Sequence, residues 1–472
     1  MQLLGTRLDL DKKDMHRILA ITMPAMVEML LAQLLGMVDT MMLGHIGELS
    51  TTALAAVGFT NNPINLMIGI LAAFNVGTTA AVAWALGAGD HKAARHAAST
   101  ALGLNLAMGT AISLLGFAFA GPLVTFMGAR GETHVFAKQY LQSVAVGMLP
   151  AALNMAVTGS LRGAGLTRLP MLYNLASNIF NVFGNYVMIY GRLGFPAMGV
   201  LGAGISTTIT RTLAAVTALI VLYRVDSKIR LRLRESFRIY KAQVMRLMRV
   251  GSTTALEQLL MQLGFILFAR NVGALGETVF AAHQIGLNIN GLSWVPSQAF
   301  GVAATALVGQ SMGSGEPLKA RACAKMVHRM ALCCSALVAV LFASASHLIA
   351  GLYIDNAEVA GLASGVLRLM ALGMPGLATQ IPIAAALRGA GDAWFPLIAS
   401  FIGIWVFRVA VAPLLIYTLG LGLTGAWLCI VLDQTVRAVV VYTRFSRGRW
   451  MRMRGLATTP ESPDVPEPPD RS

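Results

Sequence analysis

The segment Pro24-Ala-Met-Val-Glu28-Met-Leu-Leu-Ala-Gln33-Leu-Leu-Gly-Met-Val-Asp39-Thr-Met-Met-Leu-Gly44 decides the fold, because it is an apolar run long enough to cross a bilayer. It nevertheless contains two carboxylates, and a carboxylate in hydrocarbon costs at least about 2.5 kcal/mol. Glu28 and Asp39 are therefore expected to face a bundle interior or a water-filled cavity, as functional residues do. Either acid could instead be neutralised by a buried arginine or carry a proton.

The spacing of the two acids places them on one face of the predicted helix. Glu28 and Asp39 are eleven residues apart. At about 100° per residue, the side chains return to within about 20° of one direction and are separated by about 16 Å along the axis. One helix is thus predicted to carry two acidic positions at different depths.

The composition is that of an all-α integral membrane protein. The chain has 472 residues, of which 56% are hydrophobic and 12% charged, with a mean hydropathy of +0.67. The net charge of +15 arises from Lys and Arg between apolar segments, which indicates membrane topology and not nucleic-acid binding. Four cysteines lack the spacing of a zinc or redox site, and we interpret them as packing residues: Cys323, Cys333, Cys334 and Cys429.

Twelve apolar segments are long enough to span a bilayer. Gly and Pro interrupt many of them, which membrane helices tolerate because neighbouring helices satisfy the freed backbone groups. The predicted spans are residues 18–44, 52–76, 94–120, 135–160, 168–190, 199–223, 245–270, 279–308, 323–350, 360–386, 396–419 and 423–444.

The distribution of Lys and Arg orients these spans. The basic residues gather in alternate connections, which predicts a multi-pass protein of the cell membrane with both termini cytoplasmic. The chain divides into a cytoplasmic segment (1–17), an N-lobe of six spans (18–223), a basic linker (224–244), a C-lobe of six spans (245–445) and a tail (446–472). The tail is rich in proline and acidic residues, so we expect it to be disordered.

The two lobes repeat one another. The sequence EMLLAQL at 28–34 resembles EQLLMQL at 257–263 with an offset of 229, and LRGAG at 161–165 recurs at 387–391 with an offset of 226. Residues that correspond at these offsets are called repeat mates below. The matches also include GAGD at 87–90 and GSGE at 313–316, and together they indicate an internal duplication.

The number of spans determines how the copies are related. Six spans is an even number, so both copies enter the membrane from the same side, as in transporters that hold substrate between parallel repeats. The lobes differ at one acid: Glu28 and Glu257 are repeat mates, but Phe268 stands eleven residues after Glu257, so Asp39 has no mate. The N-lobe is therefore predicted to carry the extra acid.

Several motifs together resemble the multidrug and toxic compound extrusion (MATE) family over residues 15 to 445. These are the P-x13-V-D-T-x-M-x-G pattern from Pro24 to Gly44, the paired LRGAG elements, the GAGD and GSGE loops, and N-x-x-N-x-x-x-N followed by Tyr-Gly at 178–191. The resemblance implies two six-helix lobes arranged as a V. It also implies export of cationic or amphipathic compounds driven by inward H⁺ or Na⁺.

The family resemblance also implies site residues. Asp39 matches the acid of the first span, Asn181 a cation-site asparagine and Thr207 a threonine of the sixth span, and with Asn185 they form the predicted cation-coupling site. Glu257 matches a glutamate of the seventh span, and we predict that Glu257 and its mate Glu28 bind substrate or a second ion.

Two departures from the family leave the coupling ion open. Asn185 and Leu377 stand where some relatives have aspartates. A Na⁺ ion needs several oxygen ligands, whereas a proton needs a single carboxylate in an apolar setting. The loss of one acid beside Asp39 weakens a Na⁺ site, so H⁺ is somewhat favoured over Na⁺. We expect no cofactor, and no metal other than Na⁺ at Asp39.

Other polar residues within the spans have structural interpretations. Asp433 and Arg437 are four residues apart and are predicted to pair. Arg211 and Arg408 are expected to pack or snorkel, although either could neutralise an acid of the other lobe. His283 is interpreted as a packing histidine.

The arginines of the two LRGAG elements are also given a structural role. Arg162 and Arg388 are expected to bond the last carbonyls of their helices and not to touch substrate.

The leading functional hypothesis is a secondary antiporter that exports organic cations or amphipathic drugs, acts as a monomer among membrane lipids and binds no nucleic acid. The alternative is a lipid-linked oligosaccharide flippase. The sequence contains neither G-x-x-x-x-G-K-[ST] nor H-E-x-x-H, so neither an ATP-driven pump nor an enzyme is expected. A channel fits a two-fold repeat with acids inside the membrane less well than alternating access does.

Overall fold

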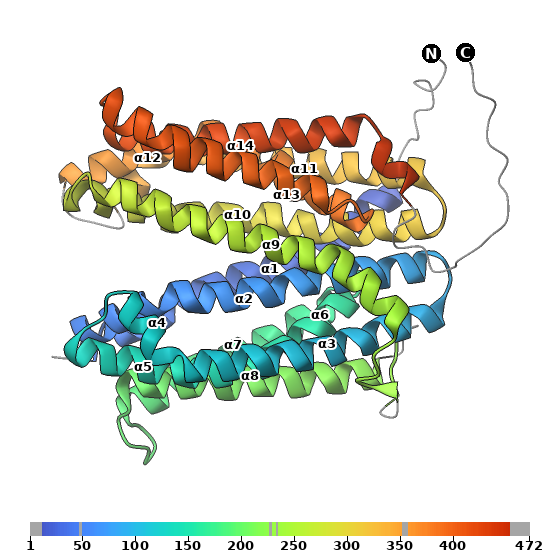
Figure 1. Ribbon diagram of the computed structural model, residues 1–472, viewed down its shortest axis with the longest axis horizontal. Helices are drawn as coiled ribbons and strands as arrows, with labels where there is room; N and C mark the ends of the chain where they lie inside the picture. Colours follow the sequence, from blue (N-terminus) through green and yellow to red (C-terminus); the bar gives the residue numbers. More distant parts are fainter. Residues whose placement is uncertain (1–11, 47–49, 226–228, 233–234, 352–356, 454–472) are drawn as a thin grey trace.

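The computed structural model describes residues 12–46, 50–225, 229–232, 235–351 and 357–453, and all its elements are helical (Figure 1). The first half contains α1 (Lys12–Leu43), α2 (Ser50–Gly87), α3 (His91–Ala118), α4 (Ala120–Phe126), α5 (Gly131–Val146), α6 (Met148–Gly163), α7 (Arg168–Tyr190) and α8 (Gly199–Arg224). The second contains α9 (Lys241–Gly273), α10 (Glu277–Gly313), α11 (Pro317–Gly351), α12 (Ala357–Gly389), α13 (Trp394–Phe401) and α14 (Gly422–Ser446). Two π-helical segments (Ile402–Val411 and Leu414–Thr418) continue α13, and a 3₁₀ turn (Arg449–Arg452) follows α14.

The helices are long and apolar, as a membrane protein requires. Eight described helices could cross a membrane, or nine if α5 and α6, which meet at 42°, form one bent span. Each predicted span coincides with a helix or with consecutive helices of the described chain. The prediction of an all-α integral membrane protein is confirmed, and the count of twelve spans stays a prediction. The predicted disordered tail falls largely on residues 454–472, outside the described residues.

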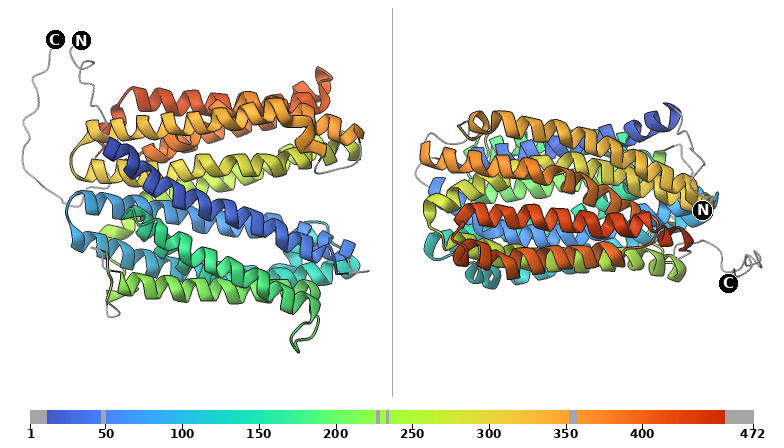
Figure 2. Two further views of the ribbon diagram at one scale, coloured as in Figure 1. Left: turned by 180° about the vertical axis from the view of Figure 1, so that it is seen from behind. Right: turned by 90° about the horizontal axis from the view of Figure 1, so that it is seen from above.

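The helices form two groups that meet along one edge. Figure 1 shows α3 to α8 on one side with α1 and α2, and α9 to α14 on the other. The names N-lobe (α1 to α8) and C-lobe (α9 to α14) are kept for these groups. In Figure 2, α1 runs obliquely between them, and it packs both on α7 of the N-lobe and on α10 of the C-lobe. Two helices therefore link the lobes most directly, since α2 also packs on α9 and α10.

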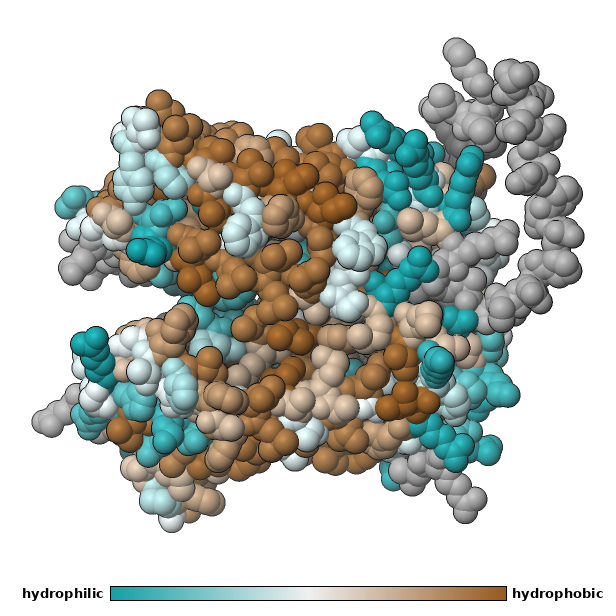
Figure 3. Space-filling model, in the orientation of Figure 1, coloured by the Kyte–Doolittle hydropathy of each residue, from teal (hydrophilic) through white to brown (hydrophobic). Residues whose placement is uncertain are grey.

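The two ends of the molecule differ. Figure 3 shows a hollow between the lobes at one end, which we call the open end. At the other end, where α1 begins and α14 ends, the lobes are in contact, and we call this the closed end. Apolar side chains cover the middle of the visible surface and polar ones gather near the ends, as expected of a chain that crosses a bilayer.

The closed end is held by two reciprocal hydrogen bonds between the lobes. The Trp84 indole N–H donates to the Gly389 carbonyl at 2.7 Å, and the Gln310 amide donates to the Gly163 carbonyl at 2.8 Å. Trp84 and Gln310 are repeat mates, and so are Gly163 and Gly389, so each lobe makes the same bond to the other. We call this pair of bonds the latch. Each bond joins residues that are far apart in the sequence, so the latch depends on the docking of the two lobes.

Two glycines let the latch helices approach closely. Gly87 at the end of α2 and its mate Gly313 at the end of α10 lie against the partner helix, where an added Cβ at Gly87 would collide with the Gln310 carbonyl oxygen. An added Cβ at Gly313 would collide with the Trp84 carbonyl oxygen. Only a residue without a side chain fits at either position, which explains why the GAGD and GSGE loops begin with glycine.

Candidate functional site

Asp39 lies in α1 at the centre of a small polar cluster in the N-lobe. The Asn185 side-chain amide, on α7 and 1% exposed, donates a hydrogen bond to Asp39 Oδ1 at 2.7 Å. Asn185 also approaches Asn181 Oδ1 at 3.5 Å, one turn earlier on α7. The structure therefore brings together three of the four predicted cation-coupling residues.

The fourth predicted residue, Thr207, has another bonding partner. Its hydroxyl donates to the Ala203 carbonyl in its own helix, α8, at 2.9 Å. The α8 residue that joins the cluster is Thr210, whose hydroxyl accepts a hydrogen bond from Asn181 at 3.2 Å. Thr210 is one turn from Thr207, and no sequence pattern would choose between the two hydroxyls.

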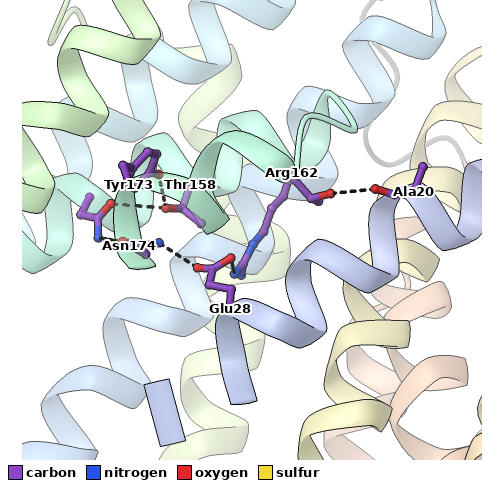
Figure 4. A network of polar contacts seen from close by, with 8 residues as sticks. Ala20, Glu28, Thr158, Arg162, Tyr173 and Asn174 are labelled. Carbon is purple, nitrogen blue, oxygen red and sulfur yellow. Dashed lines mark hydrogen bonds and ion pairs between the residues drawn. The ribbon is translucent and has the colours of Figure 1, made fainter. Parts of the chain in front are cut away.

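Glu28 is neutralised inside the N-lobe. Figure 4 shows its carboxylate between Arg162 of α6 and Asn174 of α7. The Arg162 guanidinium lies 3.0 Å from Glu28 Oε2, and the Asn174 amide donates to Oε1 at 2.7 Å. The neutralisation by a buried arginine that the sequence left open is thus observed for Glu28.

Glu257 has the same environment in the C-lobe. The Arg388 guanidinium lies 2.6 Å from Glu257 Oε2, and the Ser400 hydroxyl donates to Oε1 at 2.6 Å. Arg162 and Arg388 are repeat mates, and so are Asn174 and Ser400. We call the two arrangements the paired-acid clusters. Both predicted substrate residues therefore have carboxylates that are already occupied by an arginine.

The two arginines were expected to bond carbonyls at their helix ends, and that expectation is wrong. Arg162 and Arg388 instead reach across to an acid on the first helix of their own lobe. The physical reason is the cost of a lone carboxylate inside the bilayer. An ion pair with the arginine offsets this cost, whereas an arginine bonded to backbone carbonyls would leave the carboxylate without a counter-charge. The duplication of both members at nearly equal offsets was the one available signal.

The buried ion pair at Asp433 confirms one prediction and extends it. Asp433 is fully buried on α14, and Arg437 lies 2.7 Å from it, as predicted for residues four apart. Arg408, from the π-helical segment, lies 2.6 Å from the same carboxylate. The segment approaches closely because Gly403 has no Cβ, which would otherwise collide with the Asp433 carboxylate. Arg408 therefore neutralises an acid of its own lobe and not of the other lobe.

The N-lobe lacks the corresponding acid. Thr207 is the repeat mate of Asp433, and Arg211 is the mate of Arg437. Within the described residues, Arg211 has no carboxylate within 4.0 Å, and its guanidinium contacts the Met148 sulfur at 3.8 Å. This is consistent with the packing role expected for Arg211.

His283 is buried in an aromatic environment. Its ring meets Trp427 edge-on with centroids 5.5 Å apart and Phe268 at 5.9 Å. These contacts agree with the interpretation of His283 as a packing residue. Across the described part of the chain, no group of three or more His, Cys, Asp or Glu side chains could hold a metal ion.

The predicted spans contain four acids: Glu28, Asp39, Glu257 and Asp433. Three of them have an arginine within 4.0 Å, whereas Asp39 has no basic partner at that distance among the residues that the structure describes. Asp39 is held by an amide instead. Among the described residues it is therefore the one acid of the four without an arginine counter-charge.

A prediction follows for the paired-acid clusters. Replacing Glu257 by Ala leaves the Arg388 guanidinium, 16% exposed, without its counter-charge, and removing one partner of a buried pair costs about 3–5 kcal/mol. We expect a clear fall in the melting temperature of the purified protein, partly recovered in the double variant Glu257→Ala, Arg388→Ala. Arg388→Ala alone is expected to lower stability and leave substrate preference unchanged.

The matched control is an exposed pair. Glu316 and Lys319 are 3.2 Å apart but about half exposed, so Glu316→Ala should cost at most about 1 kcal/mol. Equal effects at Glu257 and Glu316, or a changed order of substrates in Arg388→Ala at equal expression, would contradict a purely structural role for the cluster.

Comparison with known proteins identifies the family. The MatE family profile matches residues 24–187 and 254–414. The chain is 30% identical over 440 residues to a probable multidrug resistance protein NorM of Thermotoga maritima, with 92% of each chain covered. It is 30% identical to the uncharacterized transporter YisQ of Bacillus subtilis, with 93% of this chain and 95% of the relative covered.

Solved structures share the fold. A multidrug resistance MATE family transporter of the MOP superfamily, solved in an outward-facing conformation, aligns with a TM-score of 0.85 at 24% identity and covers 92% of this chain and 96% of its own. The profile match falls in both lobes, in agreement with the motif resemblance. This chain belongs to the MatE family of membrane transporters.

Proposed function

We propose that this protein is a secondary antiporter that exports cationic or amphipathic organic compounds in exchange for H⁺ or Na⁺ by alternating access. The observation that carries the proposal is the Asp39 carboxylate, which has no basic partner within the described part of the chain, whereas the other three span acids are each paired with arginine. The names of the multidrug relatives support the same substrate class.

An unpaired acid can couple two fluxes. If ion and drug compete for the Asp39 charge, neutralisation by one removes the attraction for the other, so the two move in opposite directions. The paired acids are unsuited to this task, because Arg162 and Arg388 already neutralise them. We therefore assign coupling to Asp39. Substrate or second-ion binding at Glu28 or Glu257 would require that the arginine first be displaced.

The proposal allows either ion at Asp39. Asn185 Oδ1 is buried and has no hydrogen-bond donor among the residues that the structure describes, so one amide oxygen beside the carboxylate is free to contact a cation. A protonated Asp39 would become a donor, and the Asn185 amide could turn to accept from it. We favour the proton, because a single carboxylate suffices for it, whereas Na⁺ would need further oxygens such as those of Asn181 and Thr207.

In the proposed alternating-access cycle, the latch closes one side of the protein and the hollow opens the other. The positive-inside distribution favours a cytoplasmic closed end, so the hollow would face outward and release substrate there. The opposite state requires the bonds of Trp84 and Gln310 to break. Each lobe can then move as a unit around α1 and α2, with the single chain acting as a monomer.

The coupling ion can be tested in proteoliposomes. We expect the purified protein to transport an ethidium-like cation when a pH gradient alone is imposed, with no Na⁺ present, because Asp39 can exchange drug for a proton. Accumulation should follow the sign of the gradient and vanish when a protonophore collapses it.

Each outcome separates the alternatives. Transport that requires a Na⁺ gradient would replace the proton assignment by Na⁺. Dye flux that ignores both gradients would indicate a channel. Movement of a lipid-linked oligosaccharide but not of the dye would favour the flippase alternative over the antiporter.

A further inference from the structure

A basic pocket at the closed end of the C-lobe lies outside the site described above. It has a volume of about 290 Å³ and lies between the start of α13 and the end of α14. Its basic residues are Arg444, Arg447 and Arg449, and its apolar wall includes Phe395, Val439 and Val440. We propose that this pocket binds the phosphate headgroup of an anionic phospholipid, with an acyl chain along the apolar wall.

Contacts with neighbouring side chains hold the first arginine of the pocket in place. The Arg444 Nε donates to Asp392 at 2.8 Å, and its guanidinium lies 4.4 Å from the centroid of the Phe395 ring. These two contacts fix the position of Arg444 and neutralise one of the three positive charges. Two charges remain for a ligand.

The two remaining arginines are positioned by the chain that follows α14. The chain turns at Gly448, which has a φ of +69°, and Trp450 is fully buried, with its ring stacked on Phe445 at 5.4 Å. Arg447 and Arg449 flank this turn. The buried tryptophan therefore fixes the position of the backbone from which both arginine side chains extend. Among the described residues, neither arginine has a carboxylate within 4.0 Å.

The apolar wall distinguishes a lipid from a free anion. Val439 is 59% exposed on α14, and Trp394 at the start of α13 is 61% exposed, as expected of an aromatic side chain at the edge of the bilayer. Phosphate alone would use only the arginines, whereas a phospholipid uses both the basic rim and the exposed apolar wall. Basic pockets beside spanning helices are the sites at which anionic headgroups are held.

The N-lobe shows that the fold does not require this pocket. The repeat mates of Asp392 and Phe395 are leucines, and those of Arg444, Arg447 and Arg449 are Ala218, Val221 and Tyr223. The positive charge of this pocket is therefore present in the C-lobe and absent from the corresponding positions of the N-lobe. A lipid bound here would brace α13 against α14, the helices that carry Ser400 and Asp433.

The proposal can be tested by titrating the purified full chain with lipid and following its melting temperature. We expect phosphatidylglycerol to raise the melting temperature and phosphatidylcholine with the same acyl chains to have no comparable effect. Because an arginine near an anionic headgroup contributes about 1 kcal/mol, the double variant Arg447→Ala, Arg449→Ala should need about thirtyfold more phosphatidylglycerol for half of the shift. Its melting temperature without lipid reports whether the variant folds.

The matched control removes two other arginines. Arg232 and Arg238 are exposed in the segment between the lobes, and Arg232→Ala, Arg238→Ala is expected to change the half-saturating concentration less than twofold. Equal losses in both double variants would show diffuse attraction and overturn the proposal. So would an equal shift with inorganic phosphate, which would leave an anion site without a lipid, or the absence of any shift with phosphatidylglycerol.

Discussion

Asp39→Asn is expected to abolish drug efflux and leave the protein folded and inserted. The amide removes the titratable charge but keeps the size of the side chain and its ability to bond Asn185, which now donates to Asp39 at 2.7 Å. The free energy of unfolding should therefore change by no more than about 1 kcal/mol. Efflux of an ethidium-like dye from cells at equal membrane abundance should fall to the level of cells without the protein.

Asp39→Glu is the matched control, because it keeps the carboxylate and changes only its reach. We expect partial efflux in this variant, since competition between ion and drug survives while the bond to Asn185 is displaced. Normal efflux by Asp39→Asn would rule out a coupling role for this acid. Loss of efflux together with loss of the folded protein would indicate a structural role instead.

Gly87→Ala is expected to slow transport by disfavouring closure of the latch. The new Cβ would collide with the Gln310 backbone carbonyl, which belongs to a helix and cannot turn away. Overpacking costs about 1–3 kcal/mol, which lowers the population of the closed arrangement by about 5- to 150-fold relative to the open one. Dye efflux should fall by a similar factor if closure at this end is an obligatory step.

The conformational effect can be measured separately from transport. In a background with the four native cysteines replaced, Ser311→Cys places a thiol on α10 beside the latch, where Ser311 is 7% exposed. In the purified protein, where both ends are accessible, a thiol reagent should label it faster in Gly87→Ala. Gly58→Ala is the matched control on the same helix, because an added Cβ there meets no atom of the described residues within 4 Å. Equal labelling and efflux in both variants would remove the latch from the cycle.

Most of the fold could be predicted because it depends on patterns within each half. Apolar length predicted the helices, and repeated motifs predicted two related halves. Only local pairs could be found among the polar contacts, such as Asp433 with Arg437, which one helical turn brings together. Arg408 joins them from a π-helical segment, whose wider turn changes which residues share a face, so no helical spacing predicts its partner.

The remaining site contacts join distant parts of the chain. Glu28 and Arg162 are 134 residues apart, and Glu257 and Arg388 are 131 apart, so no local spacing could reveal either pair. The clustering of Asp39, Asn181 and Asn185 was anticipated from the family resemblance and not from the residues themselves. On α8 it is Thr210 that accepts a hydrogen bond from Asn181, although Thr207 and Thr210 both donate their hydroxyl protons to the preceding turn, so no property of either residue type chooses between them.

The latch has a consequence for the origin of the chain. Each half donates one hydrogen bond to the other, from Trp84 to Gly389 and from Gln310 to Gly163, and both the donors and the acceptors are repeat mates. This reciprocity is the pattern of an isologous dimer interface. A six-helix ancestor could therefore have assembled with a second copy of itself through this contact. In such a dimer every substitution occurs twice. Fusion into one polypeptide removed that constraint, so that one half could keep an unpaired acid at Asp39 while the other placed Phe268 at the corresponding position.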